Sequence, residues 1–129
     1  MRLTVVLIDD DPDDLELMQD AINEVVPLAL CIPFSHPAKA IKALVDRIGS
    51  FAPDHIFLDH NMPEMMGIEC LKVLRSMKEL DNTAISIVST SMDELDSKLF
   101  TSFGADFTFR KPNSVKEYNK LLRIVFGLG

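Results

Sequence analysis

Four apolar runs in this 129-residue sequence are followed directly by residues suited to metal and phosphate chemistry. Those residues are Asp9, Asp10 and Asp11, then Asp59, then Ser89, Thr90 and Ser91, and finally Arg110 and Lys111. Carboxylates are ligands of hard divalent cations, hydroxyls can contact phosphoryl oxygens, and lysine supplies one positive charge. They form a candidate site if the fold brings the ends of these runs together.

Gathering these side chains in one crevice would require a counter-charge. Two carboxylates about 4 Å apart repel by roughly 1 kcal/mol in water and roughly 4 kcal/mol at an effective dielectric of 20. Lys111 alone cannot balance three or more carboxylates. Mg²⁺ fits the remaining need, because it takes one or two carboxylates, keeps several waters and binds phosphate oxygens. The sequence therefore indicates Mg²⁺ together with a phosphoryl group.

Some of these acidic residues also have a structural interpretation. Asp11 precedes Pro12, a pattern typical of a helix that begins with a capped first turn. Asp13 and Asp14 would then lie in that turn and stabilise it through the helix dipole. We interpret these three aspartates as capping residues, whereas Asp9 and Asp10 end an apolar run and are harder to explain in this way.

The remaining sequence predicts the elements that must position these residues. The predicted strands are residues 3–8, 28–34, 55–58, 84–88 and 106–109. Between and after them, apolar residues recur at helical spacing: Leu15, Met18, Ile22, Val25; Ile41, Leu44, Val45, Ile48; Ile68, Leu71, Leu74; Leu95, Leu99, Phe103; Val115, Tyr118, Leu122, Val125. Strict alternation of strand and helix favours a parallel sheet covered on both faces.

Pro33 indicates the order of the strands. It lies within the second predicted strand, and proline in a sheet is largely confined to edges. An outermost second strand favours a single-domain, flavodoxin-like (βα)5 doubly wound α/β fold with strand order 2-1-3-4-5. In that order the ligand crevice lies beyond the carboxyl ends of the strands, where the candidate residues fall.

Composition excludes several classes of protein. A formal net charge of -7 argues against nucleic acid or an anionic membrane as partner, and 129 residues suffice for one domain. Cys31 and Cys70 lack metal-ligand spacing, and no segment reads as a signal peptide or a membrane span. We expect a cytoplasmic protein.

Four segments of the chain together resemble the receiver domain of response regulators, the CheY-like phosphoacceptor of two-component signalling. These segments are residues 5–12, 57–67, 88–90 and 104–112. The Asp-x-Asn-Met-Pro-x-x-x-Gly stretch that begins at Asp59, combined with Lys111-Pro112, is specific, although either alone would be weak. The resemblance extends over essentially the whole chain and implies the same flavodoxin-like fold.

The resemblance implies a role for each candidate residue. Asp59 would accept a phosphoryl group from the phosphohistidine of a histidine kinase. Asp10 and Asp59 would bind Mg²⁺ with the backbone carbonyl of Asn61, and Asp9 would hold a metal-bound water. Ser89 would meet the phosphoryl oxygens and Lys111 would pair with Asp59 or its phosphate. Asn61 and Ser91, each two residues beyond a site residue, are expected to form the rim of the site.

Thr108 departs from the family pattern. It stands at a switch position where the family usually has an aromatic residue. Phe107 and Phe109 flank it, but strand alternation directs them to the opposite face. We therefore expect a switch built on Ser89 and Lys111, with Thr108 in the place of the aromatic ring. The resemblance also implies a cis peptide bond between Lys111 and Pro112.

The resemblance also implies how the signal leaves the domain. Residues 92–126, which hold the fourth helix, the last strand and the last helix, would form the readout face. The partners would be a sensor histidine kinase or histidine phosphotransfer protein, and a downstream protein or a second copy of the chain. We expect residues 1–129 to be one receiver domain without an output domain, and no enzyme beyond assisting its own phosphorylation and dephosphorylation.

Two other classes of protein share parts of this pattern. Haloacid-dehalogenase-like phosphatases use an aspartyl nucleophile with Mg²⁺, but they place it on the first strand with a second aspartate two residues later. Here that position is Asn61. A pseudo-receiver, which binds partners without taking phosphate, would not need the complete set of candidate residues.

Overall fold

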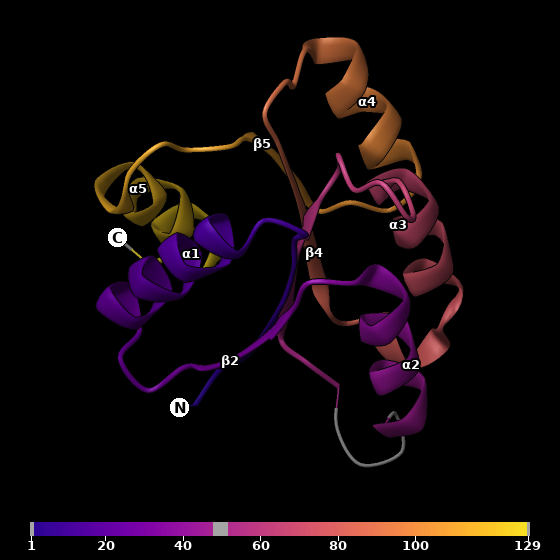
Figure 1. Cartoon of the computed structure of the whole chain (residues 1–129), viewed down its shortest axis with the longest axis horizontal. Helices are drawn as coiled ribbons and strands as arrows, with labels where there is room; N and C mark the ends of the chain where they lie inside the picture. The colour runs from indigo at the N-terminus through magenta and orange to yellow at the C-terminus, as the bar shows by residue number, and fades with distance from the viewer. Residues whose placement is uncertain (1, 48–51, 129) are drawn as a thin grey trace.

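The computed structural model describes residues 2–47 and 52–128 and shows an alternation of strands and helices along the chain (Figure 1). The strands are β1 (Thr4–Ile8), β2 (Leu30–Phe34), β3 (His55–Asp59), β4 (Ala84–Ser89) and β5 (Phe107–Arg110). The helices are α1 (Pro12–Val25), α2 (Pro37–Arg47), α3 (Gly67–Ser76), α4 (Glu94–Ser102) and α5 (Val115–Val125), with a 3-10 turn at Lys78–Leu80.

The described strands form one parallel sheet in the order β2-β1-β3-β4-β5, which confirms the predicted fold. Pro33 lies on the edge strand β2, in register with Leu7 of β1. At this edge the sheet loses no hydrogen bond from the N–H that proline lacks. The parallel register places Ile8 beside Leu58, and Asp59 beside Val88. The carboxyl ends of β1, β3 and β4 therefore lie at one edge of the sheet.

Helices cover both faces of the sheet and create two hydrophobic cores. Figure 1 shows α1 and α5 on one face and α2, α3 and α4 on the other. Alternate residues of β1 enter opposite cores, Val5 and Leu7 on the α1–α5 side and Val6 and Ile8 on the other. This burial on both faces explains why the strands read as continuous apolar runs.

Most differences from the predicted boundaries concern one or two residues at the ends of strands. β2 begins at Leu30 rather than at residue 28, because Leu28 is exposed in the connection from α1. β5 begins after Asp106, whose carboxylate accepts hydrogen bonds from Arg75 and from the backbone of Ile85. Ile48, part of the spacing that predicted α2, lies outside the described residues.

The apolar spacing that predicted α4 does not mark its buried face. Leu95, Leu99 and Phe103 are 76%, 48% and 37% exposed, whereas Phe100 is 3% exposed and packs in the core beneath α4. Asp93 and Asp96 form a capping box at the start of the helix, and Phe100 rather than the predicted stripe anchors it to the core. α4 is therefore attached to the domain by few buried side chains and presents apolar residues to solvent.

Adjacent alanine substitutions in α4 test this orientation. Phe100→Ala removes a buried ring, and we expect it to lower the free energy of unfolding by about 3–5 kcal/mol. Leu99→Ala, at the neighbouring exposed position, should change it by less than about 0.5 kcal/mol. Urea denaturation followed by circular dichroism measures both values, and equal costs would contradict the observed orientation.

Candidate functional site

The site is built from the carboxyl ends of β1, β3, β4 and β5. Asp9 follows β1, Asp59 and Ser89 are the last residues of β3 and β4, and Lys111 follows β5. The Lys111 N–H donates a hydrogen bond to the Ser89 carbonyl at 2.7 Å, which joins the segments after β4 and β5. The parallel register alone brings these residues to one edge of the sheet.

Three carboxylates meet at this edge. One carboxylate oxygen each from Asp9, Asp10 and Asp59 can be chosen so that all three lie within 4.8 Å of one another. Asp9 and Asp59 are 2% and 5% exposed, while Asp10 is exposed to solvent. Two of the three negative charges are therefore held where water screens them poorly.

Lys111 is the cation at the centre of this cluster, and its side chain is 9% exposed. Its Nζ lies 2.8 Å from Asp9 Oδ2, 2.7 Å from Asp14 Oδ2 and 3.5 Å from Asp59 Oδ1. The contact with Asp14 was missed at the sequence level, where this residue was interpreted as capping. Its position in the first turn of α1, facing the last strand's lysine, is visible only once α1 is packed on the sheet.

Burial raises the pKa of both enclosed aspartates. Desolvation raises the pKa of Asp9 from 3.8 to about 6, although Lys111 and the Asp11 N–H oppose the shift. Desolvation likewise raises the pKa of Asp59, against the charge of Lys111. Burial alone would lower the pKa of Lys111, but hydrogen bonds to Asp14 and Asp9 outweigh it, and the pKa is raised. The lysine stays protonated while the carboxylates carry the cost of burial.

Polar side chains line the other side of the crevice. The Asn61 amide Nδ2 donates to Ser89 Oγ at 3.3 Å and to Thr90 Oγ1 at 3.2 Å, and the Ser91 N–H donates to Ser89 Oγ at 3.4 Å. Asn61 and Ser91 thus surround the Ser89 hydroxyl from two loops. These contacts hold the hydroxyl at the end of β4, one residue beyond Val88, which pairs with Asp59 on the neighbouring strand.

Thr108 lies away from the carboxylates and faces α4. Its Oγ1 shares a hydrogen bond with Ser97 Oγ at 2.6 Å, so a pair of hydroxyls joins β5 to α4. Phe107 and Phe109 pack on the α1–α5 side, as strand alternation predicts, with ring centroids 6.0 Å apart.

The cis peptide bond expected between Lys111 and Pro112 is wrong for this structure, because no described peptide bond is cis. The trans form is the intrinsically preferred isomer of an X–Pro bond, by about 0.5–1 kcal/mol.

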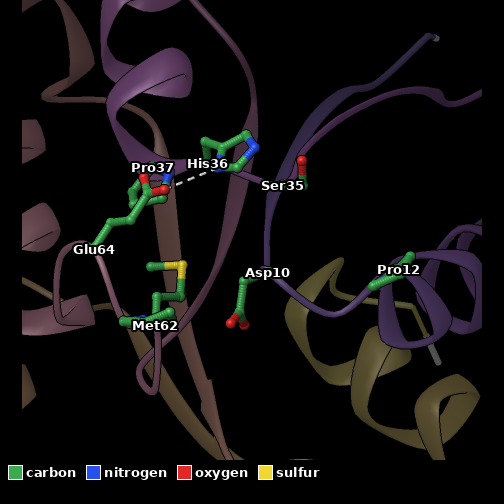
Figure 2. A pocket seen from close by; sticks show the side chains of 8 residues that line it. Asp10, Pro12, Ser35, His36, Pro37, Met62 and Glu64 are labelled. Atoms are coloured by element: carbon green, nitrogen blue, oxygen red, sulfur yellow. Dashed lines mark ion pairs between the residues drawn. The ribbon is translucent and has the colours of Figure 1, made fainter.

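A cavity of about 380 Å³ opens beside Asp10 and is lined by residues that follow β1, β2 and β3. Figure 2 shows the Asp10 carboxylate pointing into the space between Met62 and Pro12. At its mouth, His36 Nδ1 lies 3.3 Å from Glu64 Oε1, which links the loops after β2 and β3. Asp10 is therefore reachable from solvent while Asp9 and Asp59 are enclosed.

The carboxylate cluster fits a hard divalent cation. Its ligand atoms are all oxygens, the donor set that Mg²⁺ and Mn²⁺ prefer. Asp59 Oδ1 is buried and accepts no hydrogen bond from the described residues, so it has capacity for a further partner. The excess of negative charge over Lys111 supplies the electrostatic attraction for such an ion.

Comparison of the sequence with known families agrees with this geometry. The profile of the response regulator receiver domain matches residues 5–123, nearly the whole chain. The chain belongs to the response regulator receiver domain family, whose members serve as phosphoacceptors in signalling.

The curated relatives are longer proteins. A stress response regulator protein 1 from Candida albicans is 30% identical over 107 residues, which cover 83% of this chain and 36% of the relative. The protein of the same name from Clavispora lusitaniae is 44% identical over 57 residues, covering 44% of this chain and 30% of the relative. The chain thus spans about a third of the length of the curated relatives it matches.

Solved structures share the fold at low identity. The phosphorylated cyanobacterial phytochrome response regulator RcpA superposes with a TM-score of 0.82 at 19% identity, covering 97% of this chain and 91% of that one. Chemotaxis response regulator CheY4 of Vibrio cholerae gives 0.81 at 20% identity, covering 97% and 99%. The Mn²⁺-bound form of response regulator Rcp1 gives 0.80 at 21% identity, covering 95% and 91%.

The raised pKa of Asp9 predicts a pH-dependent penalty in the metal-free protein. Because the folded pKa of about 6 exceeds the unfolded value of 3.8, ionisation of Asp9 opposes folding. With respect to Asp9, the protein has its full stability below about pH 4, where this residue is neutral in both the folded and the unfolded state. It loses part of this stability as the pH rises through about 6. We expect Asp9→Asn to be more stable than wild type at pH 7.5 by on the order of 1–3 kcal/mol, and to lose this advantage toward pH 4.5.

Urea denaturation in EDTA between pH 4.5 and 7.5 measures this effect. Asp13→Asn is the matched control, because it removes one carboxylate at an exposed position in the first turn of α1, outside the enclosed cluster. A stability difference between wild type and Asp9→Asn that does not change with pH would rule the explanation out.

Proposed function

We propose that the chain accepts a phosphoryl group on Asp59 from a phosphohistidine, with Mg²⁺ bound, and passes the signal to protein partners through α4, β5 and α5. The observation that carries this proposal is the enclosed cluster of Asp9, Asp10 and Asp59 around Lys111. Family membership supports the role of phosphoacceptor. The pseudo-receiver is disfavoured, because it would gain nothing from burying these charges together.

The chemistry required of the protein is positioning and charge neutralisation. An Asp59 carboxylate oxygen attacks phosphorus and forms a P–O bond, while the P–N bond of the phosphohistidine breaks and the imidazole leaves with the bonding electron pair. Asp59 Oδ1, buried without a hydrogen-bond donor, is available for this reaction or for the metal. An enclosed carboxylate is a known type of covalent nucleophile for phosphoryl groups.

Each neighbour of Asp59 has one role in this proposal. Asp10, Asp59 and the Asn61 carbonyl would bind Mg²⁺, and Asp9 would hold one of its waters. Bound Mg²⁺ supplies charge neutralisation for the carboxylates and phosphoryl oxygens. The Ser89 hydroxyl and the Lys111 ammonium would contact the phosphoryl oxygens. Ser91, on the rim with Asn61, would limit the approach of water.

The signal would leave through the loosely attached α4. Ser89 and Lys111 are joined through their backbones, so attraction of either to a phosphoryl group displaces both loops. The Thr108–Ser97 hydrogen bond connects β5 to α4 at the place where the family usually has an aromatic ring. The exposed side chains of Leu95, Leu99 and Phe103 give this face the apolar character of a protein-binding surface.

The partners follow from this arrangement. Upstream we propose a sensor histidine kinase or a histidine phosphotransfer protein, and downstream a protein target or a second copy of the chain. The net charge of -7 disfavours nucleic acid and anionic membranes as direct partners. No helix among the described residues is long and apolar enough to cross a membrane. A cytoplasmic location stays a prediction.

Acetyl phosphate tests the phosphoacceptor directly. With Mg²⁺ present, we expect intact mass spectrometry to show one added phosphoryl group on the wild type and none on Asp59→Ala, because the nucleophile is gone. Asp13→Asn should still be modified, since that residue is exposed and outside the site. Unmodified wild type would support a pseudo-receiver, and many turnovers of a phosphate ester would support a phosphatase.

Thermal unfolding tests the metal assignment separately. A ligand that binds only the folded state at 100 times its Kd stabilises it by about 2.7 kcal/mol, so Mg²⁺ should raise the Tm of the wild type. Asp10→Ala should abolish the rise while leaving the metal-free fold intact, since Asp10 is exposed. A variant that kept the full Mg²⁺ response would show that Asp10 is not a ligand.

A further inference from the structure

Lys111 lies closer to Asp9 and Asp14 than to Asp59, the residue whose phosphoryl group it would contact. Its Nζ lies 2.7 Å from Asp14 and 2.8 Å from Asp9, within hydrogen-bond distance, but 3.5 Å from Asp59. An ammonium has only three donors, and the two carboxylate oxygens nearest to it belong to Asp9 and Asp14. The lysine is therefore held toward the beginning of α1.

The beginning of α1 fixes the place of Asp14. The helix starts at Pro12, and the Asp11 carboxylate accepts the N–H groups of Asp13 at 2.9 Å and Asp14 at 3.4 Å. α1 packs against α5 in the core on that face of the sheet, so its first turn cannot move freely. The Asp14 side chain is 26% exposed, which leaves its contact with Lys111 partly shielded from water.

We propose that Asp14 is a positioning residue that holds Lys111 away from Asp59 and competes with the phosphoryl group for its ammonium. The inference rests on the proposed function of Asp59. For Nζ to donate to a phosphoryl oxygen on Asp59, it must approach β3, and its contact with Asp14 must lengthen. Asp14 thereby weakens the binding of a phosphoryl group and shortens its lifetime.

Loss of a negative charge by itself does not explain this effect. Asp13 carries the same charge in the same helical turn, but it is exposed, and the carboxylates paired with Lys111 among the described residues are those of Asp9, Asp14 and Asp59. Substituting Asp13 therefore reproduces the change in net charge and in the helix dipole without releasing the lysine. Asp14→Glu keeps a carboxylate that can still reach Lys111.

Tyr118 of α5 provides an intrinsic spectroscopic reporter in the core beneath the site. It is the single tyrosine in a chain without tryptophan, it is fully buried, and its hydroxyl has no hydrogen-bond partner among the described residues. Burial raises the pKa of Tyr118, and Lys111, Asp14 and Asp9 all influence that pKa. Its fluorescence should therefore respond when the lysine changes partners.

The test is a titration of each variant with beryllofluoride, an analogue of the phosphoryl group, at saturating Mg²⁺. We expect Asp14→Asn and Asp14→Ala to bind about 5-fold more tightly than wild type, the effect of a partly exposed ion pair. Asp14→Glu should bind with nearly the wild-type Kd, and Asp13→Asn should be unchanged. A purely structural role for Asp14 would instead weaken binding, because a damaged site holds the analogue less well.

The outcomes separate this inference from the proposed function. If the wild type binds beryllofluoride in an Asp59-dependent way and Asp14→Asn binds equally or more weakly, Asp14 does not compete for the lysine. An equal gain in Asp13→Asn would also overturn the inference, since it would assign the effect to net charge. A wild type that binds no beryllofluoride would contradict the proposed function itself.

Discussion

The site depends on one imbalance of charge, in which carboxylates from the ends of β1 and β3 share a single buried lysine. Asp9 and Asp59 are almost fully enclosed, and desolvation raises the pKa of each despite their contacts with Lys111. Carboxylates enclosed in this way favour the binding of a cation or of a ligand that bridges them. The rest of the domain holds these side chains in place against their mutual repulsion.

That restraint comes from the sheet rather than from the site. Apolar residues of β1, β3 and β4 are buried on both faces, and the register of the strands determines which residues reach the common edge. The segments after β4 and β5 are then joined by the Lys111–Ser89 backbone hydrogen bond. Under the proposed function, this hydrogen bond would carry a change in the partners of Lys111 to the neighbouring loop.

The same structure contains an element that is weakly restrained. α4 buries Phe100, while its other large apolar side chains are exposed, and a hydroxyl pair connects it to β5. Rigid strands beside a loosely attached helix are the arrangement expected where a local change in charge is converted into a change of surface.

The sequence by itself determined the fold and the residues at the strand ends, because apolar runs, helical spacing and Pro33 are local patterns with a physical cause. It indicated Asp59 and Lys111 through a motif, but it gave no sign that Asp14 contacts Lys111, since their separation in the chain is bridged only by packing of α1. It also misidentified the buried face of α4, where Leu95 and Leu99 follow helical spacing yet face solvent. Which charges share a partner, and which apolar stripe is buried, depend on distances between elements, and those exist only in the folded chain.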